Sequence, residues 1–207
     1  MNTLIINAQP DYKNDAHYSI QLMNHFIGLF KEKYPNDTLE IRNLAGEWIP
    51  RATMDELLTV RGKQIAKKPL TEQEEKVAQR TDELLNDFMS FHRIVIVMPL
   101  HNFNIPSILK DYMDNILVAR KTFKYTPEGL AGLMTDDRRV LLLQASGSIY
   151  TNNDRYSSFE FSRMYLDTVF TQVIVRAQGT SKSAWKAERD MPLALGKLDE
   201  EFTRFYA

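Results

Sequence analysis

Short runs of apolar residues recur along the chain and predict buried β-strands. The run Ile94–Met98 does not alternate with polar residues, and the later runs 140–143 and 173–175 share this feature. Because successive side chains of a strand point to opposite faces, such runs are buried on both faces, which is typical of a parallel sheet covered by helices on each side. Residues 4–8 and 38–42 predict two further strands.

Amphipathic segments between these strands predict helices. Residues 19–33 place their apolar side chains on one face at helical spacing, and the cluster 34–37 then ends the helix. Thr71 and Glu74 predict a capping box at the start of a second, longer helix. The intervening segment 44–69 is expected to form a surface excursion with a short helix.

Strands and helices alternate to the end of the sequence, without an internal repeat, a low-complexity tract or a Gly-Ser linker. We therefore expect an α/β fold built on one doubly wound, five-stranded parallel sheet with helices on both faces. The 207 residues, of which 43% are apolar and 26% charged, suit a single domain that spans residues 1–207.

The composition narrows the classes of partner and of chemistry. A formal net charge of -1 gives no electrostatic reason to expect a nucleic acid or an anionic membrane as a partner. The absence of cysteine excludes disulfides, thiol nucleophiles and thiolate metal ligands. His17 and His25 do not have the spacing of metal ligands, so no metal site is expected. The apolar run near the start is too short for a signal peptide or a membrane span, and we expect a cytoplasmic protein.

Three loops are candidate binding segments, because ligands of open parallel sheets bind beyond the carboxyl ends of the strands. These loops comprise residues 9–19, 99–106 and 145–157. The first loop contains neither a GxGxxG fingerprint nor a Walker phosphate loop, which argues against a dinucleotide-binding fold and against an ATPase. A mononucleotide site remains compatible with the sequence.

The middle loop carries a specific resemblance. It reads Met-Pro-Leu-His-Asn-Phe-Asn-Ile-Pro over residues 98–106, and matching blocks follow at 121–125 and 128–133. With residues 7–10 and the helix end at 34–35, these segments resemble the FMN-dependent NADH:azoreductase family of flavodoxin-like quinone reductases. The resemblance implies a flavodoxin-like fold, bound FMN, NADH as electron donor, and quinones or aromatic azo compounds as acceptors. It also implies a homodimer whose active sites lie near the subunit interface.

The resemblance also assigns a role to each loop. The phosphate loop of the family corresponds to Gln9, His17, Tyr18 and Ser19, and Ser19 is also placed to cap the following helix. The segment that flanks the isoalloxazine corresponds to Leu100, His101, Asn102 and Phe103. The third FMN loop corresponds to Ala145, Ser146, Gly147 and Ser148.

This chain departs from the family pattern at three places. Many members have serines where this chain has Gln9 and His17, and the arginine common in the third loop is absent. The connection at residues 170–172 is shorter than is usual in the family. The affinity for FMN and the shape of the substrate pocket are therefore left open.

The resemblance implies no catalytic side chain, because FMN carries the chemistry. Phe123, Tyr150 and Leu100 are predicted to roof one short pocket, by loop position alone. Since no second nucleotide fingerprint occurs, NADH and the acceptor are expected to use this pocket in turn, with ping-pong kinetics. Outside the motif, His101 reads as an ordinary surface histidine, and Tyr150 is equally compatible with a core aromatic.

Two other functions remain open at this point. The altered phosphate loop and the missing arginine are compatible with a flavodoxin-fold binding or regulatory module that has weak or no flavin binding. A single-electron carrier is the other alternative. The near-neutral charge counts against it, because flavodoxin carriers are typically strongly acidic.

Overall fold

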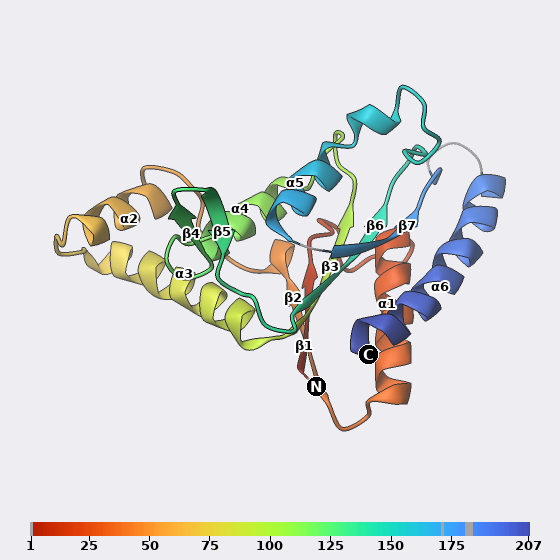
Figure 1. Cartoon of the computed structure of the whole chain (residues 1–207), viewed down its shortest axis with the longest axis horizontal. Helices are drawn as coiled ribbons and strands as arrows, with labels where there is room; N and C mark the ends of the chain where they lie inside the picture. The colour runs from red at the N-terminus through yellow and green to blue at the C-terminus, as the bar shows by residue number, and fades with distance from the viewer. Residues whose placement is uncertain (1, 171, 181–183) are drawn as a thin grey trace.

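The computed structural model describes residues 2–170, 172–180 and 184–207. Its centre is a five-stranded parallel sheet with the strand order β2-β1-β3-β6-β7 (Figure 1). The strands are β1 (Asn2–Asn7), β2 (Thr38–Asn43), β3 (Arg93–Pro99), β6 (Arg139–Ala145) and β7 (Gln172–Ala177). The α/β class and the flavodoxin-like, five-stranded parallel sheet predicted from the sequence are thus confirmed.

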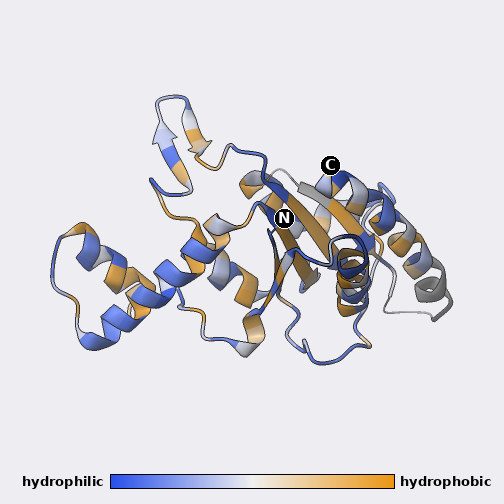
Figure 2. Ribbon diagram, turned by 90° about the horizontal axis from the view of Figure 1, so that it is seen from below, coloured by the Kyte–Doolittle hydropathy of each residue, from blue (hydrophilic) through white to orange (hydrophobic). Residues whose placement is uncertain are grey.

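Helices cover both faces of this sheet, which explains the apolar runs without alternation. One face packs against α1 (Tyr18–Lys33) and α6 (Ala184–Tyr206), and the other against α3 (Glu72–Ser90), α4 (Ser107–Ile116) and α5 (Phe161–Val169). Within β3, Val95 belongs to the core on the α1 side and Ile96 to the core on the α3 side, and both side chains are fully buried. Figure 2 shows the strands of the sheet as a hydrophobic centre between helices.

Two elements extend away from the sheet on the side of α3. The short helix expected within residues 44–69 is α2 (Leu57–Ile65), which follows a 3-10 turn at Leu44–Gly46. The second element is a hairpin of β4 (Phe123–Thr126) and β5 (Gly129–Gly132). This hairpin was not predicted from the sequence, because each strand has only four residues and two glycines bound the second.

The start of α3 confirms the predicted capping box. The Thr71 hydroxyl accepts a hydrogen bond from the backbone N–H of Glu74 at 3.4 Å, and the Glu74 carboxylate accepts one from the backbone N–H of Thr71 at 2.7 Å. Of the helices that the structure describes, none is long and apolar enough to cross a membrane. The shortened connection at residues 170–172 falls partly outside the described residues, because Thr171 is not among them.

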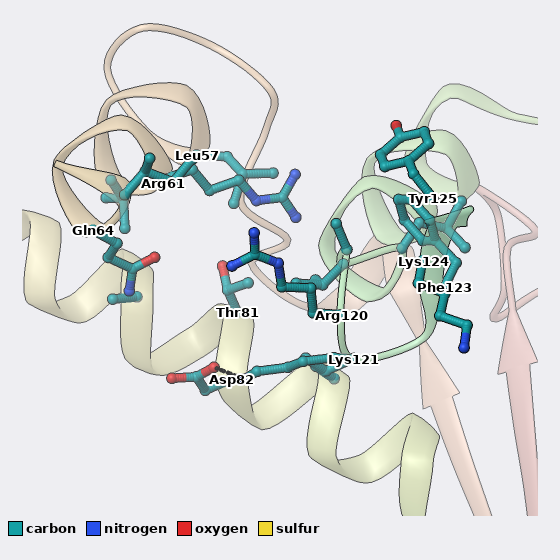
Figure 3. Close-up of a pocket in the computed structure, with 17 residues that line it drawn as sticks. Leu57, Arg61, Gln64, Thr81, Asp82, Arg120, Lys121, Phe123, Lys124 and Tyr125 are labelled. Carbon is teal, nitrogen blue, oxygen red and sulfur yellow. Dashed lines mark hydrogen bonds and ion pairs between the residues drawn. The ribbon is translucent and has the colours of Figure 1, made fainter. Parts of the chain in front are cut away.

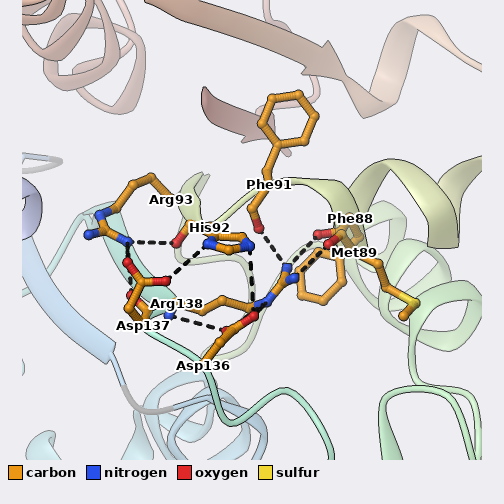
Figure 4. A network of polar contacts seen from close by, with 8 residues as sticks. All are labelled: Phe88, Met89, Phe91, His92, Arg93, Asp136, Asp137 and Arg138. Atoms are coloured by element: carbon orange, nitrogen blue, oxygen red, sulfur yellow. Dashed lines mark hydrogen bonds and ion pairs between the residues drawn. The ribbon is translucent and has the colours of Figure 1, made fainter. Parts of the chain in front are cut away.

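The end of α3 is capped by an arginine from a distant loop. No basic residue lies in the last turn of α3, although the carbonyl groups there carry the negative end of the helix dipole. Arg138 fills this role, since its guanidinium donates to the carbonyls of Phe88, Met89 and Phe91 at 3.3, 2.6 and 2.6 Å (Figure 4). Asp136 holds the same guanidinium from the other side at 3.0 Å.

We predict that Arg138→Met destabilises the protein by roughly 1.5–3 kcal/mol, because charge-assisted hydrogen bonds to helix carbonyls are lost. Chemical denaturation measures this change. The exposed pair of Arg163 with Asp167 on α5 supplies the control, since Arg163→Met is expected to change stability by about 0.5 kcal/mol or less. Equal effects of the two substitutions would contradict the capping role.

Candidate functional site

The three candidate loops lie side by side at one edge of the sheet. Backbone hydrogen bonds continue the parallel pairing past the strand ends: the N–H of Ala8 donates to the carbonyl of Val97 at 2.8 Å. The N–H of Leu100 donates to the carbonyl of Ala145 at 2.7 Å, and that of Ser146 to the neighbouring β7 at 2.9 Å. The loops after β1, β3 and β6 therefore begin in register with one another, at the point where the strand order reverses between β1 and β3.

The first loop leads into the N-terminus of α1. No acidic residue lies in the first turn of this helix, so its free N–H groups and its positive dipole end are available to an anion. Gln9 is buried, and its side-chain amide donates to the Ser19 hydroxyl at 3.1 Å. His17 contacts the Asp11 carboxylate at 3.0 Å, and this hydrogen bond is the main reason why the pKa of Asp11 lies below its usual range.

One prediction about this loop is wrong. The residue that precedes α1 is His17, whose extended backbone makes it the N-cap, and its side chain forms no capping hydrogen bond. Ser19 lies inside the first turn instead, fully buried, and it accepts from Gln9 rather than from a helix amide. Tyr18 is the first residue of the helix. The cap was predicted at Ser19, two residues after its observed position at His17, and was therefore assigned to the wrong side chain.

The middle loop contains a tight two-residue turn. His101 and Asn104 exchange backbone hydrogen bonds at 2.9 Å in both directions, and the two residues between them have positive φ angles, 47° for Asn102 and 67° for Phe103. This is the signature of a type I′ turn, in which asparagine or glycine is usual and phenylalanine is strained. The strain is typical of functional sites, where surrounding contacts hold an unfavourable backbone in place.

The third loop is tied to the segment that follows β7. Ser146 donates its hydroxyl proton to the carbonyl of Ser148 at 2.8 Å, and Gly147 lies between them. The N–H of Thr180 donates to the carbonyl of Ser146 at 3.2 Å. Tyr150 is held through its N–H, which donates to Gln178 at 2.9 Å, and partial burial raises the pKa of the Tyr150 phenol. These contacts fix the loop without an arginine in the loop itself.

An aromatic cluster links the middle loop to the segment before α5. The ring of Phe103 meets that of Phe159 edge to face, with centroids 6.0 Å apart, and Phe159 meets Tyr156 in the same way at 6.1 Å. All three rings are exposed to solvent. The Phe103 carbonyl also accepts a hydrogen bond from the N–H of Phe161 at 2.9 Å. We call Phe103, Phe159 and Tyr156 the aromatic shelf.

Phe123 lies in another part of the structure from the three loops. It lines a cavity of about 1020 Å³ between α2, α3 and the β4–β5 hairpin, into which Arg61 and Arg120 extend (Figure 3). Burial lowers the pKa of the Arg61 guanidinium. The described residues that line this cavity include neither Tyr150 nor Leu100. One chain therefore does not bring the three predicted pocket residues together.

The strand order identifies an open α/β protein. Its three loops lie at the topological switch point, where proteins of this class bind their ligands. Comparison with known proteins gives the family. The flavodoxin-like fold family matches residues 1–181. An FMN-dependent NADH:quinone oxidoreductase 1 from Lactiplantibacillus plantarum is 51% identical over 211 residues, covering 99% of this chain and 98% of that protein.

Further relatives agree with this assignment. A protein with the same name from Bacillus cereus is 48% identical over 86% of this chain and 87% of its own length. The crystal structure of an FMN-dependent NADH-azoreductase from Bacillus anthracis in complex with FMN superposes with a TM-score of 0.94, at 42% identity and with complete coverage of both chains. The chain belongs to the flavodoxin-like family of FMN-dependent NADH:quinone oxidoreductases.

The site fits an FMN molecule. The α1 N-terminus presents uncapped backbone amides of the kind that bind a phosphate, and the middle loop presents backbone groups and an exposed ring of the kind that flank a planar heterocycle. Tyr156 and Phe159 of the aromatic shelf were not predicted from the sequence, because the segment 151–160 carries no motif. The only signal was its density of aromatic residues in a loop.

We predict that Phe103→Gly is more stable than Phe103→Ala by about 1–2 kcal/mol, because only glycine adopts the left-handed backbone without steric cost. Both variants lack the ring, so their difference isolates the backbone of the turn. Urea denaturation of the two proteins measures it. If Phe103→Ala were equally stable, the turn would not be strained at this position.

Proposed function

We propose that this protein is an FMN-dependent oxidoreductase that passes electrons from NADH to quinones and to aromatic azo compounds. The observation that carries this proposal is the strained turn at Asn102 and Phe103, set beside an uncapped helix N-terminus at the switch point of the sheet. The names of the relatives support the same activity. Because NADH is a metabolite of the cell interior, we also propose a cytoplasmic location.

Each loop has a role in this proposal. The amides at the start of α1 would hold the phosphate, and the 3.1 Å hydrogen bond from Gln9 to the buried Ser19 ties the first loop to this turn of the helix. Backbone groups of residues 100–103 would hold the polar edge of the isoalloxazine, and the exposed Phe103 ring would pack beside it. Backbone groups of residues 145–148 enclose it from the β6 side. FMN held by these residues would supply the hydride and two-electron transfer between NADH and the acceptor.

The rival function, a binding or regulatory module without flavin, rests on the departures of the phosphate loop from the family. The geometry of the phosphate loop argues against this function. The Asp11 carboxylate is hydrogen-bonded to His17 at 3.0 Å, and Asp15 accepts a hydrogen bond from Asn24 at 3.2 Å, so both side chains are held by partners within the protein. Backbone amides need no particular side chain to bind a phosphate.

The proposal predicts that the protein binds one FMN per chain. Asn102→Ala is expected to weaken FMN binding about tenfold or more, equivalent to roughly 1.4 kcal/mol, because the turn loses a residue that tolerates positive φ. His25→Ala serves as the control, since His25 lies within α1 and is hydrogen-bonded to Asp199 of α6. Quenching of FMN fluorescence measures the affinities. Wild-type protein that does not bind FMN would instead support the module without flavin.

Steady-state kinetics with NADH and a quinone should be ping-pong, with parallel double-reciprocal lines and substrate competition at high concentration. The physical reason is that one face of the flavin serves both substrates in turn, since no second nucleotide-binding fingerprint occurs in the sequence. Intersecting lines would mean that both substrates bind together, and would require a separate nicotinamide site.

We also propose that the protein is a homodimer whose subunits complete each other's pockets. The support is the position of Phe123 in the cavity beside α2, away from Tyr150 and Leu100. Exposed apolar side chains surround this part of the molecule, with Ile65 on α2 84% exposed and Tyr125 on the hairpin 77% exposed. Apolar surface of this kind marks interaction sites. In such a dimer, the partner subunit covers this surface. Phe123 of one subunit then lies beside the flavin loops of the other.

Sedimentation equilibrium at micromolar concentration is expected to give twice the 24.1 kDa mass of one chain. A complementation experiment then tests the shared pocket. Phe123→Ala and Asn102→Ala are each expected to lose activity, and a refolded mixture should regain part of it, because mixed dimers contain one intact site. A monomeric mass, or a mixture no more active than its components, would contradict this arrangement.

A further inference from the structure

A buried polar network lies directly behind the aromatic shelf. Arg176 on β7 and Glu160, at the start of α5, form an ion pair in which Nη2 lies 3.1 Å from Oε1 and 3.2 Å from Oε2. The two side chains are only 13% and 5% exposed. Arg176 also donates to Gln144 at 3.0 Å, and Gln144 donates to the Ser162 hydroxyl at 3.0 Å. Ser162 in turn donates a hydrogen bond to Glu160 at 3.3 Å, so the four side chains form a closed ring of hydrogen bonds.

Burying this network costs free energy, and the packing of the core alone does not explain why polar residues stand there. Removing two charges from water costs several kcal/mol for each ion, and an apolar pair of similar volume is often as stable or more stable. Leu142 and Ile174 precede Gln144 and Arg176 on the same face of their strands and are apolar. The polar network follows these apolar residues at the last position of this face on both strands, which points to a reason for it other than general stability.

The position of Glu160 in the chain identifies that reason. Glu160 stands between Phe159, a member of the aromatic shelf, and Phe161, whose N–H donates to the Phe103 carbonyl. The Glu160 side chain is thereby anchored to the sheet, while the residues on either side of it contact the strained turn of the middle loop. Each ring of the aromatic shelf is more than a third exposed, so few neighbouring side chains hold it in place.

We propose that the buried Glu160–Arg176 pair is a positioning device for the electron acceptor. It fixes the aromatic shelf beside the isoalloxazine edge, where the exposed rings of Phe159 and Tyr156 stack on a planar aromatic acceptor. Neither Glu160 nor Arg176 touches the reacting atoms. This inference rests on the proposed function, and it adds the residues that set the affinity for planar acceptors.

The test compares Glu160→Gln, Glu160→Gln/Arg176→Met and the exposed control Arg163→Gln, each loaded with FMN. In Glu160→Gln, the KM for 2-methyl-1,4-naphthoquinone should rise about threefold to tenfold with little change in kcat, because ground-state positioning is lost. The KM for ferricyanide, a small acceptor without an aromatic face, and the FMN content should not change. The Phe161 amide should exchange its hydrogen about tenfold faster, as its bond to Phe103 opens more often.

The double variant separates positioning from stability. Its melting temperature should recover towards the wild-type value, because no unpaired buried charge remains, while its naphthoquinone KM should stay raised. The positioning role would be overturned if the melting temperature and the naphthoquinone KM of the double variant both returned to the wild-type values. It would also be overturned if the KM for ferricyanide rose in Glu160→Gln as much as the KM for the naphthoquinone. If the wild-type protein reduced neither acceptor, the proposed function would fail. Hydrogen exchange at Phe161 would still decide the anchoring, because an unchanged rate in Glu160→Gln contradicts it.

Discussion

The site depends on backbone hydrogen bonds that continue past the ends of the parallel strands. The bonds from Ala8 to Val97 and from Leu100 to Ala145 keep neighbouring loops in register for one more residue after the sheet ends. As a result, the α1 N-terminus, the turn at Asn102 and the loop after β6 meet at one edge. The two-sided burial of the sheet makes this edge rigid, since helices on both faces restrain the strands that carry the loops.

Rigidity at this edge explains how the chain tolerates two costly features there. A phenylalanine in a left-handed conformation costs conformational energy and a buried ion pair costs desolvation energy, and both occur within a few residues of the same loop contact. The N–H of Phe161 connects them, because it donates to the Phe103 carbonyl next to Glu160. Both costs therefore occur at the loops that we propose to hold FMN and its acceptor.

Much of the fold could be predicted from the sequence, because two-sided burial leaves an unambiguous pattern. The run at Ile94–Met98 predicted β3, and Thr71 with Glu74 predicted the start of α3. The loops were predicted as a set, since the carboxyl ends of parallel strands share one edge. Local features could be predicted less well. The cap of α1 lies at His17 rather than at Ser19, and the β4–β5 hairpin has no periodic pattern of apolar residues.

Long-range polar contacts were not predictable at all. Nothing in the sequence around Glu160 indicates that it meets Arg176, because the pairing depends on how α5 packs over β6 and β7. The cavity that Phe123 lines depends likewise on the placement of the hairpin against α2 and α3. Sequence patterns report which faces are buried, whereas such contacts follow from the tertiary arrangement of several elements.

The central claim is that the three loops hold an FMN that NADH reduces before the acceptor binds. The most direct measurement mixes the FMN-loaded protein with NADH in the absence of oxygen and of any acceptor, and follows the visible absorbance of the flavin. We expect complete bleaching by one equivalent of NADH and recovery of the absorbance when a quinone is added afterwards. An absorbance that bleaches only when NADH and quinone are present together would contradict this claim.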